Sequence, residues 1–334
     1  MRAVALLSGG LDSTLAAKVV LQQGIELEAL NFITIFCNCT NRGETCLASQ
    51  KAVESLGIPL RVFNVSEEYL DVVKHPKHGY GRNMNPCIDC RIFMMKKATK
   101  YMTEAGASFL VTGEVLGERP MSQRRDAMRL IEREADLEGL ILRPLSAKLL
   151  PPSIPEKEGW VDREKLLNIQ GRSRKPQIQL AAFFGIHDYP CPAGGCLLTD
   201  PGFAKRIKDL MVHDPDFTLN DVHLLKMGRH FRLSREVKLV VGRHEEENEK
   251  IQTFAQGEDI SLRVSSFPGP LSLLRGKLDQ GDIEKAAAIT AHYSKAKELK
   301  DIEVTYRSGD EDHYHSLFVF PILRREIEKL MINE

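Results

Sequence analysis

The chain has 334 residues, of which 43% are hydrophobic, and its 46 basic side chains balance its 46 acidic ones. This length suits two domains, and the neutral total excludes a strong overall field that would attract nucleic acid to the whole surface. No stretch approaches the ~18 consecutive apolar residues of a membrane-spanning helix, and the first apolar run, 3–7, is too short for a signal peptide. We therefore expect a cytoplasmic protein with no membrane partner.

The first 150 residues alternate short apolar runs with amphipathic stretches. This strict alternation predicts an α/β fold, a doubly wound parallel sheet with helices on both faces. Ligands of such sheets bind beyond the carboxyl ends of the strands. The expected strands are 4–7, 27–35, 60–65, 108–112 and 140–142, and the expected helices are 12–23, 46–56 and 90–104.

The pattern changes in two steps after residue 150. The Pro-rich segment 149–160 is expected to leave the sheet, and helical and Gly/Pro-rich stretches follow it. We therefore expect residues 151–215 to form a helical, Cys-containing extension of the domain 1–150. Beyond about residue 215 come β-rich segments, a long helix at 282–298 and a last strand at 302–306. Residues 216–334 are therefore expected to form a smaller α+β domain.

The sequence SGGLDS, residues 8–13, stands where the first expected strand passes into the first helix. Adjacent glycines let backbone N–H groups approach an anion, and the helix directs its positive N-terminal end at the same place. This motif resembles the signature of the PP-loop ATP pyrophosphatase family, whose fold is HUP-like, and an ordinary capped turn is the alternative. The resemblance implies that ATP and Mg²⁺ are cofactors, that pyrophosphate leaves from the α-phosphate, and that ATP contacts Ser8, Gly9, Gly10, Asp12 and Ser13.

A second motif, LVTGEVLGERPMSQ at 110–123, resembles the corresponding segment of tRNA 4-thiouridine synthases, the ThiI family. It is one residue longer than the usual form and contains Pro120. The segment LRPLS at 142–146 is similar to the Arg-Pro-Leu element of the same family. The positions that the resemblance assigns to the lining of the ATP site are Leu6, Leu7, Asn31, Phe32, Arg91, Gly113 and Gln123.

Seven cysteines occur in the chain, and in a reducing compartment they indicate metal ligands or reactive thiols more than disulfides. Cys87 and Cys90 follow Asn-Pro, and Cys191 and Cys196 flank a Gly-rich turn much later in the chain. This arrangement resembles tRNA-thiolating PP-loop enzymes, both the MnmA-like 2-thiouridylases and iron-sulfur-dependent 4-thiouridine synthases. The resemblance implies a 4Fe-4S cluster held by Cys87, Cys90 and Cys196, with Cys191 as the alternative third ligand and an open iron that carries sulfide.

Two other chemistries fit the same cysteines. Zinc would be bound by all four thiolates, which close a structural site. Without a metal, Cys87 or Cys196 would carry a persulfide and the other would resolve it as a disulfide. Cys37, Cys39 and Cys46 follow the second expected strand and are either a second metal site or incidental buried thiols.

The last hundred or so residues contain a local excess of positive charge. Six Lys or Arg residues and one Glu occupy 226–243, which is typical of a solvated surface or of a phosphate-binding stripe. Segments 238–251, 267–270 and 282–306 together resemble the NFACT RNA-binding domain, and this resemblance implies RNA binding. His292, Tyr293 and Lys295 are candidates for RNA contact or for packing.

Together these patterns predict an ATP-dependent tRNA sulfurtransferase that adenylates a uridine carbonyl oxygen and replaces it with sulfur. Asp12, Cys87 and Cys196 are the expected catalytic residues. The expected partners are tRNA and a sulfur donor, either sulfide or a persulfide carrier, and a homodimer is compatible with this interpretation. The alternatives are a PP-loop amide ligase, which needs no paired cysteines, and a non-catalytic RNA-binding adaptor.

Overall fold

The computed structural model describes residues 1–37, 44–189, 196–309 and 311–332. These residues form two compact units, Met1–Thr199 and Asp200–Glu334, each of which is described by itself. The part of the predicted extension 151–215 that belongs to the first unit ends at Thr199. Within the described ranges, none of the helices combines the length and the apolar character needed to cross a membrane.

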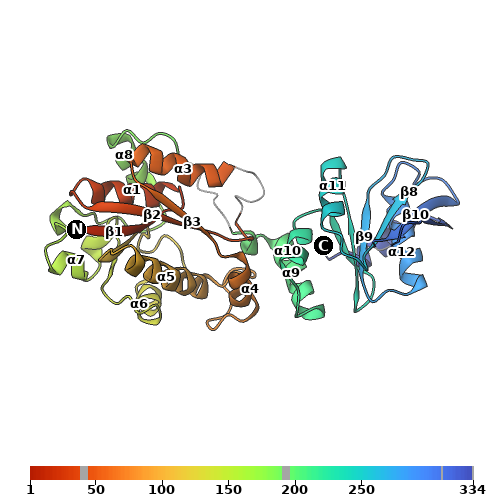
Figure 1. Ribbon diagram of the computed structural model, residues 1–334, viewed down its shortest axis with the longest axis horizontal. Coiled ribbons are helices and arrows are strands. Elements are labelled where there is room, and N and C mark those ends of the chain that lie inside the picture. The colour runs from red at the N-terminus through yellow and green to blue at the C-terminus, as the bar shows by residue number, and fades with distance from the viewer. Residues whose placement is uncertain (38–43, 190–195, 310, 333–334) are drawn as a thin grey trace. The chain divides into compact units, whose positions relative to one another are not determined.

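A five-stranded sheet forms the centre of the first unit (Figure 1), in the order β3-β2-β1-β4-β5. Every neighbouring pair in it is parallel. The strands are β1 (Arg2–Leu6), β2 (Glu26–Ile33), β3 (Leu60–Asn64), β4 (Phe109–Thr112) and β5 (Ile141–Leu142). The helices are α1 (Leu11–Leu21), α3 (Glu44–Leu56), α4 (Ser66–Lys74), α5 (Cys87–Glu104), α6 (Arg125–Glu134), α7 (Ile154–Lys157) and α8 (Lys175–Phe183), and short 3-10 turns lie at Ala147–Leu149, Arg163–Lys165 and Leu197–Thr199.

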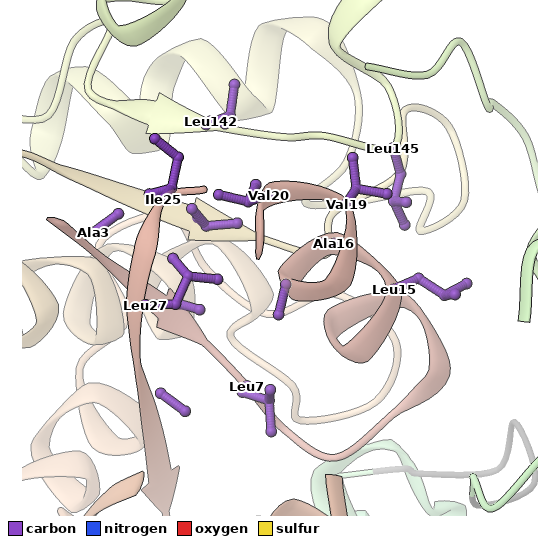
Figure 2. Packing of buried hydrophobic residues seen from close by; sticks show 14 of the residues in the cluster. Ala3, Leu7, Leu15, Ala16, Val19, Val20, Ile25, Leu27, Leu142 and Leu145 are labelled. Atoms are coloured by element: carbon purple, nitrogen blue, oxygen red, sulfur yellow. The ribbon is translucent and has the colours of Figure 1, made fainter. Parts of the chain in front are cut away.

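Alternate residues of the strands pack against helices on opposite faces of this sheet. Ala3 and Leu27 join a buried cluster with residues of α1, α3 and α8, part of which Figure 2 shows. Val4 and Leu110 belong to a second buried cluster, formed with α5 and α6. Helices therefore cover both faces, and the predicted doubly wound parallel sheet is confirmed.

The second unit is built on a six-stranded antiparallel sheet in the order β11-β10-β8-β9-β7-β6. Ile283 and Ala287 of the helix α12 pack against one face, while Leu224 and Ile251 of two other helices pack against Val240 on the opposite face. The predicted α+β character is confirmed. The strands are β6 (Arg229–Arg232), β7 (Val237–Val241), β8 (Ile260–Val264), β9 (Ser272–Gly276), β10 (Ile302–Ser308) and β11 (His315–Val319), and the helices are α9 (Pro201–His213), α10 (Leu219–Leu225), α11 (Glu245–Thr253), α12 (Gln280–His292) and α13 (Arg324–Leu330).

The helix predicted at 282–298 is wrong at its C-terminal end, because α12 stops at His292. The Ser294 hydroxyl donates to the Ala291 carbonyl over 2.7 Å and accepts a hydrogen bond from the Ala296 N–H over 3.0 Å. Such local side-chain bonds compete with the backbone bonds that would continue a helix.

Candidate active site

The loop between β1 and α1 is pressed against the backbone of α3. Gly9 has φ +77°, and a Cβ atom there would lie 2.5 Å from both the Ala48 carbonyl carbon and the Ser49 nitrogen. Gly10 precedes α1 in an extended conformation and has no side chain with which to cap the helix. The N–H groups of the first turn of α1 therefore remain directed at whatever anion occupies the loop.

Two serine hydroxyls lie at this loop. Ser13 Oγ donates to the Gly10 carbonyl over 2.9 Å, and Ser8 Oγ lies 3.3 Å from Ser13 Oγ. We call residues 8–13 the anion loop. Its backbone N–H groups, its two hydroxyls and the N-terminus of α1 lie together, and binding of an anion by them stays a prediction from the SGGLDS motif.

The end of β4 meets the anion loop at Gly113. A Cβ atom at Gly113 would lie 2.4 Å from the Ser13 nitrogen and 2.5 Å from the Asp12 carbonyl carbon. Only glycine permits this approach of strand to helix, so the second sequence motif is brought directly to the first.

The neighbouring strand β2 forms hydrogen bonds with the backbone of Leu7, directly before the anion loop. Asn31 Nδ2 on β2 donates to the Leu7 carbonyl over 2.8 Å, and the Leu7 N–H donates to the Leu30 carbonyl over 2.9 Å. Leu6 ends β1 and Leu7 is buried. Phe32, the next residue of β2, stacks on Phe63 with ring centroids 6.2 Å apart.

Two of the predicted ATP-lining residues bind other parts of the protein. Arg91 Nε lies 3.4 Å from Glu114 Oε1, and the buried Gln123 side chain accepts a hydrogen bond from the Arg119 N–H over 2.9 Å. The Gln123 carbonyl also accepts from the Gly117 N–H over 2.7 Å. In this arrangement Gln123 holds the shape of loop 117–123.

A polar cluster beside Asp12 was not predicted from the sequence. Arg174 Nη2, just before α8, lies 3.9 Å from Asp12 Oδ2, and Gln177 on α8 is fully buried. Asp12 Oδ1, Arg174 Nε and both polar atoms of the Gln177 side chain are buried and make no hydrogen bond of standard geometry among the described residues, although Gln177 lies near enough to Asp12 to affect its pKa. Since buried polar atoms are nearly always satisfied in native structures, this cluster is expected to meet water or a ligand. The basic sequence RSRK at 172–175 is the signal that could have indicated it.

The charges around Asp12 are coupled. Burial raises the pKa of the Asp12 carboxyl, and the Arg174 guanidinium, the Gln177 side chain and the Arg119 guanidinium oppose this rise. Burial also raises the pKa of Glu118, and the negative charge of Asp12 adds to this rise. Two carboxylates and two guanidinium groups thus lie within electrostatic range of one another beside the anion loop.

Four cysteines converge near the start of α5. Cys87 and Cys90 lie in its first turn, and Cys37 faces Cys196 across an antiparallel β-bridge. Burial raises the pKa of the Cys196 thiol, and the charges of Cys90, Cys37 and Cys87 add to this rise. Burial likewise raises the pKa of Cys90, whereas a hydrogen bond from the buried Tyr69 lowers it.

Cys37 is the member of this thiol group (Cys37, Cys87, Cys90 and Cys196) that sequence reasoning did not assign to it. Its position directly after the second strand of the sheet was the available signal. Cys191 and Cys39 lie outside the described residues, as does the side chain of Cys46. Across the described part of the chain, no set of three or more His, Cys, Asp or Glu side chains is positioned to hold a metal ion.

In the second unit, much of the basic run 226–243 is engaged within the protein. Lys238 is 9% exposed, and Arg232 Nη2 lies 2.5 Å from Asp209 Oδ2. Arg243 forms an ion pair with Glu247. An uninterrupted phosphate-binding stripe along this run is therefore absent from the described residues.

Two of the candidate RNA contacts also take part in packing. The Arg229 guanidinium lies 4.6 Å from the centre of the Tyr293 ring. His292 Nδ1 lies 2.9 Å from the Ile322 carbonyl oxygen. The side chains of Arg235 and Lys295 are exposed.

Comparison with known proteins divides the chain into two matched parts. Residues 1–148 match the family model of the thiamine biosynthesis protein ThiI, and residues 228–331 match that of the NFACT protein RNA binding domain. These matches confirm the resemblances predicted for both parts of the sequence.

Similar curated proteins include 2-thiouridylases. The tRNA-specific 2-thiouridylase MnmA of Syntrophotalea carbinolica is 32% identical over 114 residues, which are 32% of this chain and 32% of that protein. MnmA of Pseudomonas aeruginosa is 30% identical over 145 residues, which are 40% of this chain and 38% of that protein. The matches therefore span about a third of the length of these relatives.

Two solved structures are also similar. A 4-thiouridine synthetase–RNA complex with bound ATP has 24% sequence identity and a TM-score of 0.36, and the match covers 55% of this chain and 51% of that chain. The U34-tRNA thiolase NcsA from Methanococcus maripaludis, with its 4Fe-4S cluster, has 17% identity and a TM-score of 0.35, over 67% of this chain and 70% of that chain.

Proposed function

We propose that the chain is an ATP-dependent tRNA sulfurtransferase, which adenylates a uridine carbonyl oxygen and then replaces that oxygen with sulfur to form thiouridine. The observation that carries this proposal is the approach of the second motif to the anion loop, where a Cβ atom at Gly113 would lie 2.4 Å from the Ser13 nitrogen. Burial raises the pKa of Asp12, Cys87 and Cys90, and the Arg119 guanidinium opposes the rise at all three. One side chain is thus within electrostatic range of both the anion loop and the thiols.

The first step would use the anion loop. ATP would place its β- and γ-phosphates against the first turn of α1, and the carbonyl oxygen of the uridine would attack the α-phosphorus. The bond from that phosphorus to pyrophosphate would break and leave an O-adenylated base. Donors fixed before the reaction stabilise charge that develops on a leaving group, and Ser8, Ser13 and Arg174 would serve as such donors here.

Mg²⁺ fits the carboxylates beside the loop. The unpartnered Asp12 Oδ1 and the neighbouring Glu118 carboxylate are the hard oxygen donors that this ion prefers. We propose that Asp12, together with the ATP phosphates, would hold Mg²⁺, which when bound would neutralise phosphate charge. Arg174 and Gln177 would orient Asp12 for this role.

The sulfur would come from the thiol group. Its soft donors suit iron or zinc in kind, although the described residues are not positioned around one ion. We propose Cys87, Cys90 and Cys196 as the ligands of a 4Fe-4S cluster, with Cys191 as the alternative third ligand and zinc as the alternative metal. The cluster when bound would supply sulfide, and the same thiols carrying a persulfide would supply sulfur without a metal.

The second unit would bind the tRNA. Its match to an RNA-binding domain model supports this role. An uncharged carbonyl oxygen is a weak nucleophile, so a domain that holds the RNA while the base is aligned would contribute much of the rate. Arg235 of the basic run and Lys295 of the candidate RNA contacts are exposed, and we expect both to meet phosphates.

One experiment tests both halves of the reaction. Purified protein would be incubated with ATP, Mg²⁺, a sulfide source and tRNA from cells that lack thiouridine, and pyrophosphate and thionucleosides would be measured. We expect tRNA-dependent release of pyrophosphate and one new thionucleoside. Asp12→Asn should abolish both products, whereas Cys196→Ser should keep pyrophosphate release and lose the thionucleoside.

Other outcomes would favour the rival functions. Product formation that survives both Cys87→Ala and Cys196→Ala would indicate an ATP-dependent ligase. Absence of pyrophosphate release with every tRNA preparation would indicate an RNA-binding adaptor. Iron and zinc analysis of protein purified without oxygen would test the metal separately.

A further inference from the structure

The edge strand β11 carries a row of exposed aromatic side chains. Phe318 lies in this strand, and Tyr314 and Phe320 directly flank it; the three residues are 68%, 64% and 61% exposed. Side chains of a strand alternate between its two faces, so these even-numbered positions share one face. Leu317 and Val319 point to the other face, in the buried cluster formed with α12. Three rings are therefore presented on the face of the sheet that α12 does not cover.

Neighbouring strands add polar side chains to the same face. Arg263 of β8 lies opposite Thr305 of β10, which lies opposite Ser316 of β11. The Arg307 guanidinium, two residues farther along β10, lies 5.0 Å from the centre of the Tyr314 ring. Helices α10 and α11 pack on this face farther along the sheet, over β7 and β9. We call the exposed part of the face the outer patch and define it by Arg263, Thr305, Arg307, Tyr314, Phe318 and Phe320.

The two arginines of the outer patch have hydrogen-bond donors to spare. Arg275, on the helix-covered part of the same face, pairs with two carboxylates. Neither Arg263 nor Arg307 forms an ion pair with a carboxylate of the described residues, and Arg307 Nε is buried without a hydrogen bond of standard geometry there. Glu303 is an acid on this face, but it lies opposite Phe318, four residues from Arg307 along β10. The patch thus combines aromatic rings with positive charge that the protein itself does not neutralise.

Unpaired nucleotides supply the complementary chemistry. Their bases stack on aromatic rings and on arginine planes, and their phosphates accept hydrogen bonds from guanidinium groups. Residues 228–331, which include the whole outer patch, match the RNA-binding domain model. A second copy of this chain fits less well, because a symmetric contact would bring the same unneutralised arginines together. RNA whose bases are free of a duplex is therefore the occupant that the patch favours.

We propose that the outer patch binds unpaired nucleotides of the tRNA, with bases stacked on Tyr314 and Phe318 and phosphates held by Arg263 and Arg307. The identity of this RNA as tRNA rests on the proposed function. Positions 314 and 318 are about 13 Å apart along an extended strand, so the two rings receive different bases of one RNA strand, and Phe320 extends the row. Because every base has a flat face, stacking of this kind holds a single strand without reading its sequence.

The first test measures RNA binding by the full-length protein through fluorescence anisotropy, with a labelled single-stranded oligouridine and a labelled RNA duplex of equal length as probes. Phe318→Leu keeps an apolar side chain but has no ring, and we expect it to bind the single strand about tenfold more weakly and the duplex as wild type does. Phe318→Tyr restores a ring and should bind the single strand within about twofold of wild type. The matched control Phe183→Ala, which removes an 81% exposed ring of the first unit, should bind both probes as wild type does.

The second test distinguishes the arginines from the rings by the salt dependence of oligouridine binding. Arg263→Gln should reduce the steepness of the plot of log K against log salt concentration by about 0.7, the value for one phosphate contact on a single strand. Phe318→Leu should weaken binding at every salt concentration and leave this steepness unchanged. Equal salt dependence in Arg263→Gln and wild type would overturn the proposed phosphate contact.

Failure of this RNA site and failure of the proposed function give different results. A wild type that does not bind oligouridine, or a Phe318→Leu variant that binds it equally well, would overturn the site, and the proposed function would stand if that wild type forms thiouridine. Weaker binding by Phe318→Leu, together with a wild type that releases no pyrophosphate with tRNA, would overturn the proposed function and leave the RNA site intact. Light scattering that shows a wild-type dimer and a monomeric Phe318→Leu, with equal RNA affinity, would assign the patch to a second copy instead.

Discussion

Arg143 Nε donates to Glu114 Oε2 over 2.9 Å, and both side chains are almost completely buried. This ion pair joins the end of β5 to the end of β4, the two strands that carry the LRPLS and TGE motifs. Arg143 also pairs with Glu132 of α6, and Arg91 of α5 approaches the other oxygen of Glu114. Burial alone would raise the pKa of Glu114, but Arg91 and Arg143 hold it below its ordinary value.

We expect Arg143→Met to destabilise the protein by about 3–5 kcal/mol, because it leaves buried carboxylates without their main partner. Urea unfolding at neutral pH would measure this loss. The matched control is Arg124→Met, which removes an arginine that is 61% exposed and pairs with a 72% exposed Asp126, and should cost about 1 kcal/mol or less. Equal losses in the two variants would contradict the importance of the buried pair.

The Arg143–Glu114 pair also predicts that the free energy of unfolding depends on pH. Because the pKa of Glu114 is lowered on folding, its stabilising contribution is present above the unfolded-state pKa of 4.5 and disappears as the pH falls through the lowered value. The stability difference between wild type and Arg143→Met should therefore narrow below about pH 4.5.

Gly9→Ala should destabilise the protein more than Gly24→Ala. Both glycines have positive φ, +77° and +76°, but a Cβ at Gly9 would meet backbone atoms at 2.5 Å whereas nothing lies within 4 Å of one at Gly24. The change at Gly24 should cost only the backbone strain of about 1–2 kcal/mol. Thermal unfolding would compare the two, and ATP titration should show weaker binding by Gly9→Ala alone.

Arg174→Gln should lower the rate of tRNA-dependent pyrophosphate release by about a hundredfold or more, as expected when one preorganised charge is removed from a reaction site. The matched control is Arg172→Gln, because Arg172 is exposed and two residues away in the same segment. Its rate should stay within about twofold of wild type. Similar losses in both variants would indicate a general charge effect rather than the contact with Asp12.

Lys238 predicts a pH effect in the second unit, where it lines a cavity of about 570 Å³. Burial lowers the pKa of Lys238 from 10.5 to about 7; Arg232 and Arg206 act in the same direction, and Asp209 and Asp221 oppose them. Between these two values the unfolded chain binds more protons than the folded one, so stability rises with pH. The free energy of unfolding of wild type should therefore increase relative to Lys238→Met between about pH 7 and about pH 10.

Two neighbouring side chains, His230 and Lys277, can be distinguished from Lys238 as the source of this pH dependence. His230 adjoins Lys238, but burial holds its pKa well below the ordinary value, so it stays neutral in this pH range. Lys277 lines the same cavity and is 84% exposed. Lys277→Met should leave the pH profile of wild type unchanged, and parallel profiles for wild type and Lys238→Met would contradict the shift.

The sequence pattern predicts the fold of the first unit well where apolar runs and glycine stops coincide. The expected strand 60–65 and helix 12–23 correspond to β3 and α1 within two residues. Helix α6 was not predicted, because its sequence is mostly charged and it buries only Ala127, Met128 and Ile131. These buried residues recur with the spacing of one helix face, so the signal was present in the sequence, and Ile131 packs with residues of α5 in a buried cluster.

The residues of the candidate site could also be predicted from the sequence only in part. Gly113 was expected at the ATP site, and the structure brings it to the anion loop, because both motifs end strands of one parallel sheet. Arg174 and Cys37 were not assigned, because their neighbours Asp12 and Cys196 are far away in the chain and only tertiary packing joins them. The basic run 226–243 carries no sign in its sequence that Lys238 is buried.

The approach of Gly113 to α1 also restricts which residue can follow β4. A methyl group at this position would collide with the backbone of Ser13, so any larger residue would push the end of β4 away from the first turn of α1. Under the proposed function, a phosphate at the anion loop would meet backbone donors that this contact already holds in place before binding.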